Sequence, residues 1–179
     1  MNNLKIQFDS EIKKKLMQSL NLKNAMAVPT LEKITVNIGA GDALQNPKFI
    51  DMYNSDLLNI TGQKPIIIKS KKDVSNFKLR KGNKIGLKVT LRGERMWDFL
   101  EKFIKAVVPR IKDFRGYDIK SLDSQGNYTI GIKEHNVFLE IDPNKIERLH
   151  GLQFTITTST NNKEYAKELL SHIGIPFKK

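Results

Sequence analysis

The sequence contains no cysteine among its 179 residues. Disulfides, thiolate metal sites and a cysteine nucleophile are therefore excluded. It also contains no run of 18 apolar residues, so we expect neither a membrane-spanning helix nor a membrane partner. The first residues, MNNLKIQFDSEIKKKLMQ, lack the apolar centre of a signal peptide, so the sequence predicts a cytoplasmic protein.

Motifs that would support catalysis are also missing. Neither G-x-x-x-x-G-K-[ST] nor G-x-S-x-G occurs in the sequence. Gly39 and Gly41 follow a predicted strand, but Leu44 replaces the third glycine of a dinucleotide-binding fingerprint. A permissive turn is therefore a better interpretation than a nucleotide-dependent enzyme. We expect no enzyme activity and no cofactor.

The three histidines also give no support for a metal site. His135, His150 and His172 are scattered along the sequence and have no spacing such as H-x-x-x-H. We therefore expect each of them to be structural or on the surface, and we expect no bound metal.

Positive charge is what the sequence has in excess. It contains 31 Lys and Arg against 19 Asp and Glu, which gives a net charge of +12. Residues 69–95 alone carry ten basic and two acidic side chains, a net charge of +8. A basic stretch this dense is typical of a nucleic-acid-binding surface, and a solvated charged hairpin is the alternative. Lys13, Lys14 and Lys15 are interpreted either as a solvated helix face or as contacts to an RNA backbone.

The hydrophobic periodicity predicts both helices and strands. Strict alternation predicts strands over 31–38, 85–92 and 152–158, and three consecutive isoleucines predict a short strand over 66–68. Four-residue spacing of apolar side chains predicts helices over 9–22, 47–61, 94–108 and 162–172. We expect Asp9 or Ser10 to cap the first helix and Asn161 to cap the last.

These elements predict one α+β domain over residues 1–179. A mostly antiparallel sheet would carry helices on one face, and its polar face would stay open for RNA. A long basic loop would join the strands around 68 and 85. Residues 110–150 are expected to form an irregular excursion from the main sheet. Alternation assigns the following side chains to the polar face: Lys33, Thr35, Asn37, Lys88, Thr90, Arg92, Gln153, Thr155 and Thr157.

Several long segments resemble one protein family. They read EKITVNIG (32–39), TGQKP (61–65), KVTLRGERMW (88–97), PRIKDFRG (109–116), GNY (126–128) and IPFKK (175–179). In order and spacing they are similar to the bacterial family of large-subunit ribosomal protein number five. The resemblance covers essentially the full length of the chain.

The resemblance implies a non-catalytic component of the central protuberance of the large ribosomal subunit, bound to 5S rRNA. Other large-subunit rRNA and ribosomal proteins would be its neighbours. The rRNA-binding residues expected from the resemblance and the strand alternation together are Lys33, Thr35, Asn37, Gln63, Lys88, Thr90 and Arg92.

Two further contacts are implied by the resemblance. The basic loop would approach P-site tRNA through Lys71, Lys72, Asn76, Lys78, Arg80 and Lys81. The region 110–150 would meet small-subunit head protein number thirteen in an intersubunit bridge through Arg110, Lys112, Phe114 and Arg115. An RNA-binding regulatory or chaperone protein outside the ribosome is the alternative function.

The sequence also departs from the family. Ile68 and Asp73 stand where the family usually has small polar residues. The segment 135–140 lacks the proline that often precedes its glutamate, and Leu139 occupies that place. Asp73 puts an acid in the loop that the resemblance directs toward tRNA.

Overall fold

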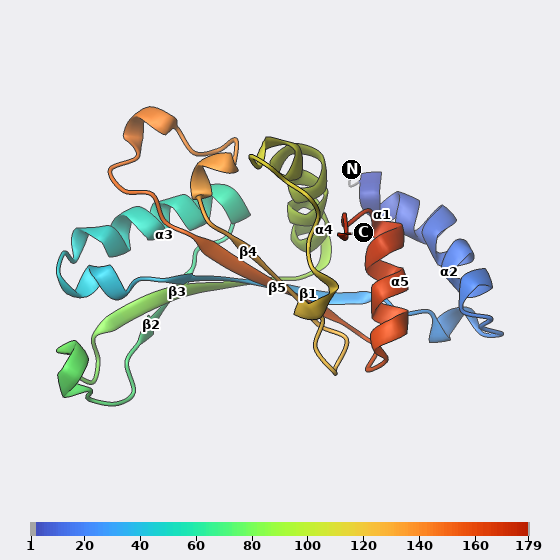
Figure 1. Cartoon of the computed structure of the whole chain (residues 1–179), viewed down its shortest axis with the longest axis horizontal. Helices are drawn as coiled ribbons and strands as arrows, with labels where there is room; N and C mark the ends of the chain where they lie inside the picture. Colours follow the sequence, from blue (N-terminus) through green and yellow to red (C-terminus); the bar gives the residue numbers. More distant parts are fainter. Residues whose placement is uncertain (1–2, 179) are drawn as a thin grey trace. The chain divides into compact units, whose positions relative to one another are not determined.

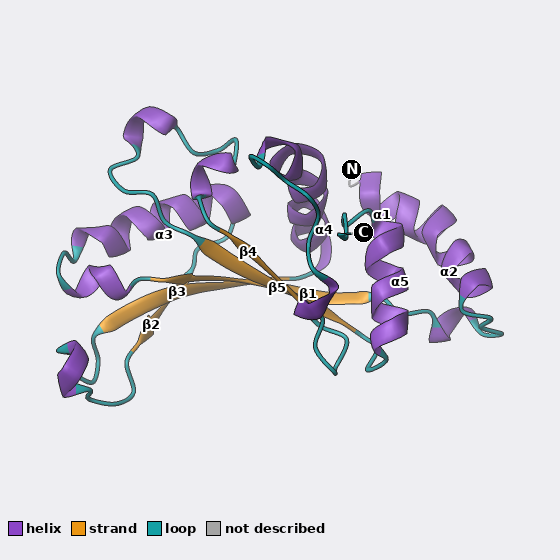
Figure 2. Ribbon diagram, in the orientation of Figure 1, coloured by secondary structure: helices purple, strands orange, loops and turns teal. Residues whose placement is uncertain are grey.

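The computed structural model describes residues 3–178 (Figure 1). Its five-stranded sheet has the order β2-β3-β1-β5-β4, and the expected α+β class is confirmed (Figure 2). The strands are β1 (Leu31–Gly39), β2 (Ile66–Lys69), β3 (Lys84–Leu91), β4 (Tyr128–Ile132) and β5 (Leu152–Thr158). The α-helices of the described part are α1 (Asn3–Gln7), α2 (Lys13–Ser19), α3 (Lys48–Thr61), α4 (Gly93–Lys102) and α5 (Lys163–Ile173).

The chain divides into two compact units, each assembled from separate stretches of sequence. The first unit contains the residues up to Ile34, Arg92–Ile130, and the residues from Thr155 onward. The second unit contains Thr35–Leu91 and Gly131–Phe154. Strands β1, β4 and β5 each contribute residues to both units.

The first helical segment of the first unit begins earlier than predicted. Helix α1 continues through a π-helical turn, η1 (Phe8–Ile12), into α2. Leu4, Phe8, Ile12 and Leu16 are buried at four-residue spacing. Neither Asp9 nor Ser10 caps the helix: the Ser10 hydroxyl donates to the Ile6 carbonyl in the preceding turn at 2.8 Å. Asp and Ser favour helix ends, but here they lie inside a helix because its buried apolar residues begin before them.

Helix α4 contributes Met96, Phe99 and Leu100 to the core of the first unit. It continues through a π-helical turn, η5 (Phe103–Val107), into a 3₁₀ turn that contains Pro109. Trp97 is also buried, with its ring centroid 5.1 Å from that of Phe8. The helix ends near Pro109, in agreement with the predicted range 94–108. Proline is tolerated in the first positions of a turn but not inside a continuing helix.

Helix α5 also belongs to the first unit, and its ends are defined by two residues. The Asn162 side chain accepts the backbone N–H of Glu164 at 2.9 Å, so the cap is Asn162 and not Asn161. Gly174 ends the helix with φ +105°, a left-handed conformation that favours glycine. Ala166, Leu169 and Leu170 of this helix are buried, in keeping with its predicted four-residue spacing.

In the second unit, α3 packs against β3. Helix α3 buries Ile50, Tyr53, Leu57 and Ile60, whereas Phe49 is half-buried, and Gly62 follows the helix with φ +65°. Strand β2 pairs with β3 in antiparallel orientation at the edge of the sheet. Its isoleucines are predicted correctly as strand residues, but Ile66 is 74% exposed.

The region expected to be irregular contributes to the sheet. Residues Tyr128–Ile132 form the edge strand β4 beside β5, so the prediction of an excursion from the main sheet is wrong for this segment. The turn before β4 is held by Asp123, whose carboxylate accepts the backbone N–H groups of Gln125 and Asn127 at 2.9 and 2.7 Å. Residues 3–178 contain no helix that is long and apolar enough to cross a membrane.

Gly86 allows strands β1 and β3 to approach closely. A Cβ atom at this position would lie 2.9 Å from the carbonyl oxygen of Ile38, and one at Gly131 would meet nothing within 4 Å. We expect Gly86→Ala to lower the free energy of unfolding by about 1–3 kcal/mol, because backbone atoms must move to admit the methyl group.

Gly131→Ala is the matched control for that substitution. It should leave the free energy of unfolding unchanged or raise it by about 0.4–1 kcal/mol, since it restricts only the unfolded chain. Urea titrations of both variants and the unmodified protein measure the difference. Equal stability of the two variants would contradict a close contact at Gly86.

Candidate nucleic-acid interface

The polar face of the second unit is formed by neighbouring strands β1 and β3. In β1, Val36 and Ile38 are fully buried, whereas Thr35 is half-buried and Asn37 is exposed. In β3, Lys88 is exposed and Thr90 is half-buried, between buried neighbours. Burial of one face of each strand thus turns these four predicted side chains to the other face.

Gln63 is brought to this part of the sheet by a hydrogen bond. It follows α3 in sequence, and its side-chain amide donates to the backbone carbonyl of Thr90 at 3.3 Å. Its backbone N–H points to the Thr61 hydroxyl, also at 3.3 Å. The structure therefore places Gln63 next to Thr90, although 27 positions separate them in sequence.

Two apolar side chains also lie on this polar face, and the strand alternation did not predict them. Strand register pairs Ile66 with Lys88 and Ile68 with Gly86. Directly paired residues of antiparallel strands project to the same side of a sheet, so Ile66 stands beside Lys88. Alternation in β2 could not reveal this, because three consecutive isoleucines give both faces the same character.

The first unit carries further predicted strand positions. Lys33 is half-buried, and Arg92 is exposed at the residue that precedes α4. Thr129 and Thr155 share a hydrogen bond of 3.0 Å between their hydroxyl groups, across β4 and β5. Their cross-strand pair gives the first unit a hydroxyl-bearing surface of its own.

The basic loop between β2 and β3 has internal structure. The side chains predicted to contact tRNA are all exposed: Lys71, Lys72, Asn76, Lys78, Arg80 and Lys81. The backbone N–H of Ser70 donates to the Asn83 carbonyl at 2.8 Å, and a β-bridge joins Val74 to Leu79 around a 3₁₀ turn. Figure 1 shows this small turn at the tip of the β2–β3 hairpin.

Asp73 has a structural role in that loop. Its carboxylate accepts the backbone N–H of Lys81 at 2.6 Å, across the narrow part of the loop. Charge-assisted hydrogen bonds of this kind are among the stronger ones in proteins. The acid that departs from the family pattern thus holds the loop together. Near the tip, Phe77 is 75% exposed.

The residues predicted for the intersubunit contact lie on the first unit. Arg110, Lys112 and Arg115 are exposed, but Phe114 is half-buried with its ring 4.9 Å from that of Tyr117. Tyr117 is paired through backbone hydrogen bonds with the segment 176–178. Burial raises the pKa of the Tyr117 phenol to about 12. The Phe114 ring therefore packs against Tyr117 and anchors the segment that carries the exposed basic side chains.

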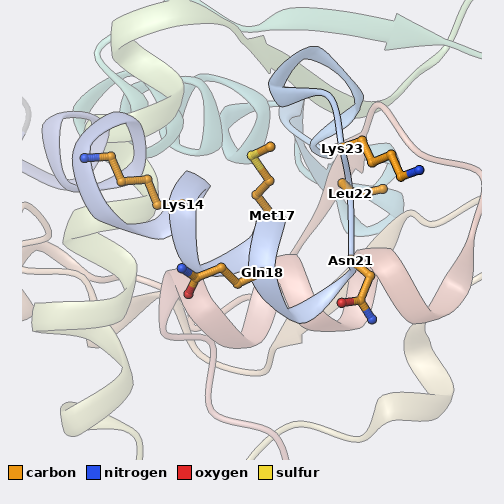
Figure 3. Close-up of a pocket in the computed structure, with 6 residues that line it drawn as sticks. All are labelled: Lys14, Met17, Gln18, Asn21, Leu22 and Lys23. Atoms are coloured by element: carbon orange, nitrogen blue, oxygen red, sulfur yellow. The ribbon is translucent and has the colours of Figure 1, made fainter.

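A separate hollow of about 680 Å³ lies beside the end of α2 in the first unit (Figure 3). Its lining residues are Lys14, Met17, Gln18, Asn21, Leu22 and Lys23. In Figure 3 the Lys14 and Lys23 side chains extend in opposite directions from Met17. Two exposed cations beside an apolar floor fit both interpretations of this helix, a solvated face and an RNA contact.

His135 and His150, which are far apart in sequence, lie together in the structure. This corrects the expectation that the three histidines are scattered. The rings of His135 and His150 stack in the second unit with centroids 3.8 Å apart and planes inclined by 20°. The nearest Asp56 oxygen lies 3.8 Å from His135 Nε2. His172 is exposed on α5, 3.7 Å from Glu168. No local spacing could have signalled the pair, because 15 residues separate its members.

A network of polar contacts holds the segment before β5 in place. Arg148 lies 3.3 Å from an oxygen of Asp42, and its guanidinium sits 5.3 Å from the centre of the Phe49 ring. The Tyr53 hydroxyl donates to Asp42 at 2.6 Å. Burial, with the neighbouring Asp42 carboxylate, raises the pKa of Tyr53 well above its usual range.

Comparison with known proteins identifies the class of this chain as a protein of the large ribosomal subunit. Residues 24–80 match the family described as "Ribosomal protein L5", and residues 84–177 match the C-terminal part of the same ribosomal family. The "Large ribosomal subunit protein uL5" of Halothermothrix orenii (strain H 168) is 50% identical over 177 residues, which are 99% of each chain.

The chain therefore belongs to the ribosomal protein L5 family. As a member it is a structural constituent of the large ribosomal subunit, and it is located in the cytoplasm within the ribosome.

Removing the Asp73 carboxylate should loosen the basic loop. In Asp73→Ala we expect the Lys81 amide to exchange with solvent roughly tenfold faster, because its charged acceptor is gone. Hydrogen exchange followed by NMR measures this directly. Asp51→Ala removes an equal charge from the exposed side of α3 and should leave Lys81 unchanged. Equal Lys81 exchange rates in all three proteins would show that Asp73 does not order the loop.

Proposed function

We propose that this protein binds 5S rRNA through the polar faces of its strands and holds it in the central protuberance of the large subunit. The observation that carries the proposal is the set of four adjacent polar side chains on β1 and β3: Thr35, Asn37, Lys88 and Thr90. They offer hydroxyl, amide and ammonium groups and contain no acid. Hydroxyl and amide groups suit phosphate and 2′-hydroxyl contacts to folded RNA.

Other residues of the same unit extend this surface. Gln63 lies against Thr90, and Ile66 lies beside Lys88, where an apolar side chain can cover the sugar face of a nucleotide. In the first unit, Lys33 and Arg92 add positive charge. No aromatic ring belongs to these strand positions, so base stacking has no support and shape with backbone contacts is the favoured mode.

The basic loop is proposed to contact P-site tRNA. Its six predicted side chains are exposed, and backbone hydrogen bonds and Asp73 give the loop a defined shape. A loop that is already ordered loses less conformational entropy on binding than a flexible one. The exposed Phe77 adds a ring that can lie against a base or a ribose.

The segment 110–116 is proposed to contribute to an intersubunit bridge with small-subunit head protein number thirteen. Arg110, Lys112 and Arg115 present positive charge from a short segment that Phe114 attaches to Tyr117. Long-range attraction of such a patch to an acidic surface speeds association and fixes orientation more than it adds affinity.

Substitutions on the strand face test the 5S rRNA contact. We expect Asn37→Ala and Thr90→Ala each to weaken binding of 5S rRNA by about 1–3 kcal/mol, since each leaves a polar group of the RNA without its partner. Lys48→Ala, on the exposed start of α3, is the control and should bind like the unmodified protein. Filter-binding titrations with 5S rRNA and with an unrelated structured RNA measure both affinity and specificity.

Two results of that experiment would reject the proposal. Unchanged affinity in both strand variants would remove β1 and β3 from the interface. Equal affinity of the unmodified protein for both RNAs would favour the alternative function, that of an RNA-binding regulatory or chaperone protein outside the ribosome.

Charge removal separates the roles of the loop and the strands. We expect replacement of Lys71, Lys72, Lys78 and Lys81 by Ala to leave 5S rRNA binding within about twofold and to weaken retention of P-site tRNA on reconstituted ribosomes. Each phosphate contact that is lost should also reduce the salt dependence of tRNA binding by about one unit of slope.

The matched control removes the same charge elsewhere. Replacement of Lys48, Lys64, Lys163 and Lys167 by Ala lowers the net charge equally but leaves the loop intact. It should retain tRNA like the unmodified protein. A collapse of 5S rRNA binding in the loop variant would instead assign the loop to that RNA.

A further inference from the structure

Three side chains from separate parts of the sequence meet in the second unit. Asp56 comes from α3, His135 from the 3₁₀ turn η8 (His135–Val137), and His150 from the residue two positions before β5. One ligand atom from each lies within 4.8 Å of the other two. His135 is 1% exposed and His150 is 9% exposed. Two buried imidazoles beside a carboxylate form a set of donors that divalent transition metals favour.

The surroundings of His135 suit a metal ligand. The backbone N–H of His150 donates to its Nδ1 atom at 3.3 Å, and the carbonyl oxygen of His150 also lies 3.3 Å from Nδ1. In the other tautomer, Nδ1 carries the proton and donates to that carbonyl instead, and the Nε2 lone pair is then free on the side of Asp56. Donation of the second ring N–H to a backbone carbonyl is the usual way in which proteins orient a metal-binding histidine.

His150 provides the second argument. Both of its ring nitrogens are buried, and neither makes a hydrogen bond of ordinary geometry within residues 3–178. A buried imidazole that makes no such bond costs free energy compared with an apolar ring of the same shape. Packing against Tyr53, at a centroid distance of 4.2 Å, and against His135 would be served equally well by phenylalanine. The unused nitrogens therefore point to a ligand.

The protonation states agree with metal binding. Burial lowers the pKa of His150 to about 4, against a smaller opposing effect of the Arg148 backbone. Burial also lowers the pKa of His135, so both rings are neutral near pH 7 and keep a lone pair. Burial raises the pKa of Asp56 because its charge is poorly solvated. A cation next to this carboxylate would replace the solvation that burial removes.

Solvent and ions can reach the cluster. A hollow of about 310 Å³ is lined by Asp56 and His135 and also by the acidic residues Glu140 and Asp142. It offers room for a water molecule at a fourth coordination position, and its acidic lining favours entry of a cation. The rings now lie stacked, so coordination requires one of them to turn. Turning His150 would give up only its weak contact with the Arg148 backbone and no hydrogen bond of ordinary geometry.

We propose that Asp56, His135 and His150 form a binding site for one divalent transition-metal ion of the Zn²⁺ type. The ion would take two imidazole nitrogens and one carboxylate oxygen, with water from the hollow completing a tetrahedron. It would tie α3 to the segment 133–150, which Arg148 and Asp42 already attach to the same unit. The site is independent of RNA binding and predicts a property of the isolated protein.

Metal titration of the full-length protein without an affinity tag tests the proposal. In competition with a chromophoric chelator, we expect the protein to bind one Zn²⁺ per chain. When Co²⁺ replaces Zn²⁺, we expect the strong visible absorption bands that are typical of tetrahedral Co²⁺. Asp56→Asn, His135→Gln and His150→Phe should each weaken Zn²⁺ binding by roughly 100-fold or more, because each removes a ligand. His172→Gln is the matched control and should bind Zn²⁺ like the unmodified protein.

The His150→Phe variant keeps the proposal testable if other variants fold poorly. It preserves the stacked rings and removes the two unpartnered nitrogens, so its metal-free form should melt at the same temperature as the unmodified protein or higher. Added Zn²⁺ should then raise the melting temperature of the unmodified protein only. Failure of the unmodified protein to bind Zn²⁺ in a one-to-one ratio would overturn the site. Binding of Zn²⁺ by Asp56→Asn and His150→Phe as tightly as by the unmodified protein would overturn it as well.

Discussion

The close approach of strands β1 and β3 determines which side chains the second unit can present to a partner. The backbone N–H of Ala40 donates to the Ile85 carbonyl at 2.9 Å, and Gly86 leaves no room for a Cβ atom against Ile38. With the apolar residues of both strands packed on the side of α3, Asn37 and Lys88 must point away from the core. A slip of one residue in either strand would exchange the two faces completely.

The resulting polar face contains apolar and amide side chains as well as charged ones. Ile66 and Ile68 enter the polar face through the register of β2, and Gln63 enters it through its bond to Thr90. The loop beyond β2 concentrates positive charge, but Asp73 and a short β-bridge give that charge a fixed arrangement. Specific recognition of folded RNA depends on such arrangement, because net charge alone attracts every polyanion.

The His135–His150 stack gives the second unit a feature apart from its polar strand face. Membership of the ribosomal protein L5 family accounts for the strands, the basic loop and the closing segment, which the matched regions cover. The stacked rings of His135 and His150 lie beside Asp56, and the two ring nitrogens of His150 are buried without a hydrogen bond of ordinary geometry. A cluster that stabilises the segment 133–150 would act on a region near the sheet without changing the RNA-facing side chains.

The sequence by itself determined the elements whose signals are local. Period-two alternation specified β1, β3 and β5, and four-residue spacing specified α3 and α5. Those signals were enough to place Asn37, Lys88 and Thr90 on one polar face. They failed where a local preference was overridden, as at Asp9 and Ser10, which lie inside a helix because its apolar stripe begins at Leu4. Only the tertiary structure decided the rest: β4 joined the sheet, Ile66 came to stand beside Lys88, and His135 met His150 and Asp56. Each of these depends on pairing between distant segments, which the local spacing of residues along the chain cannot predict.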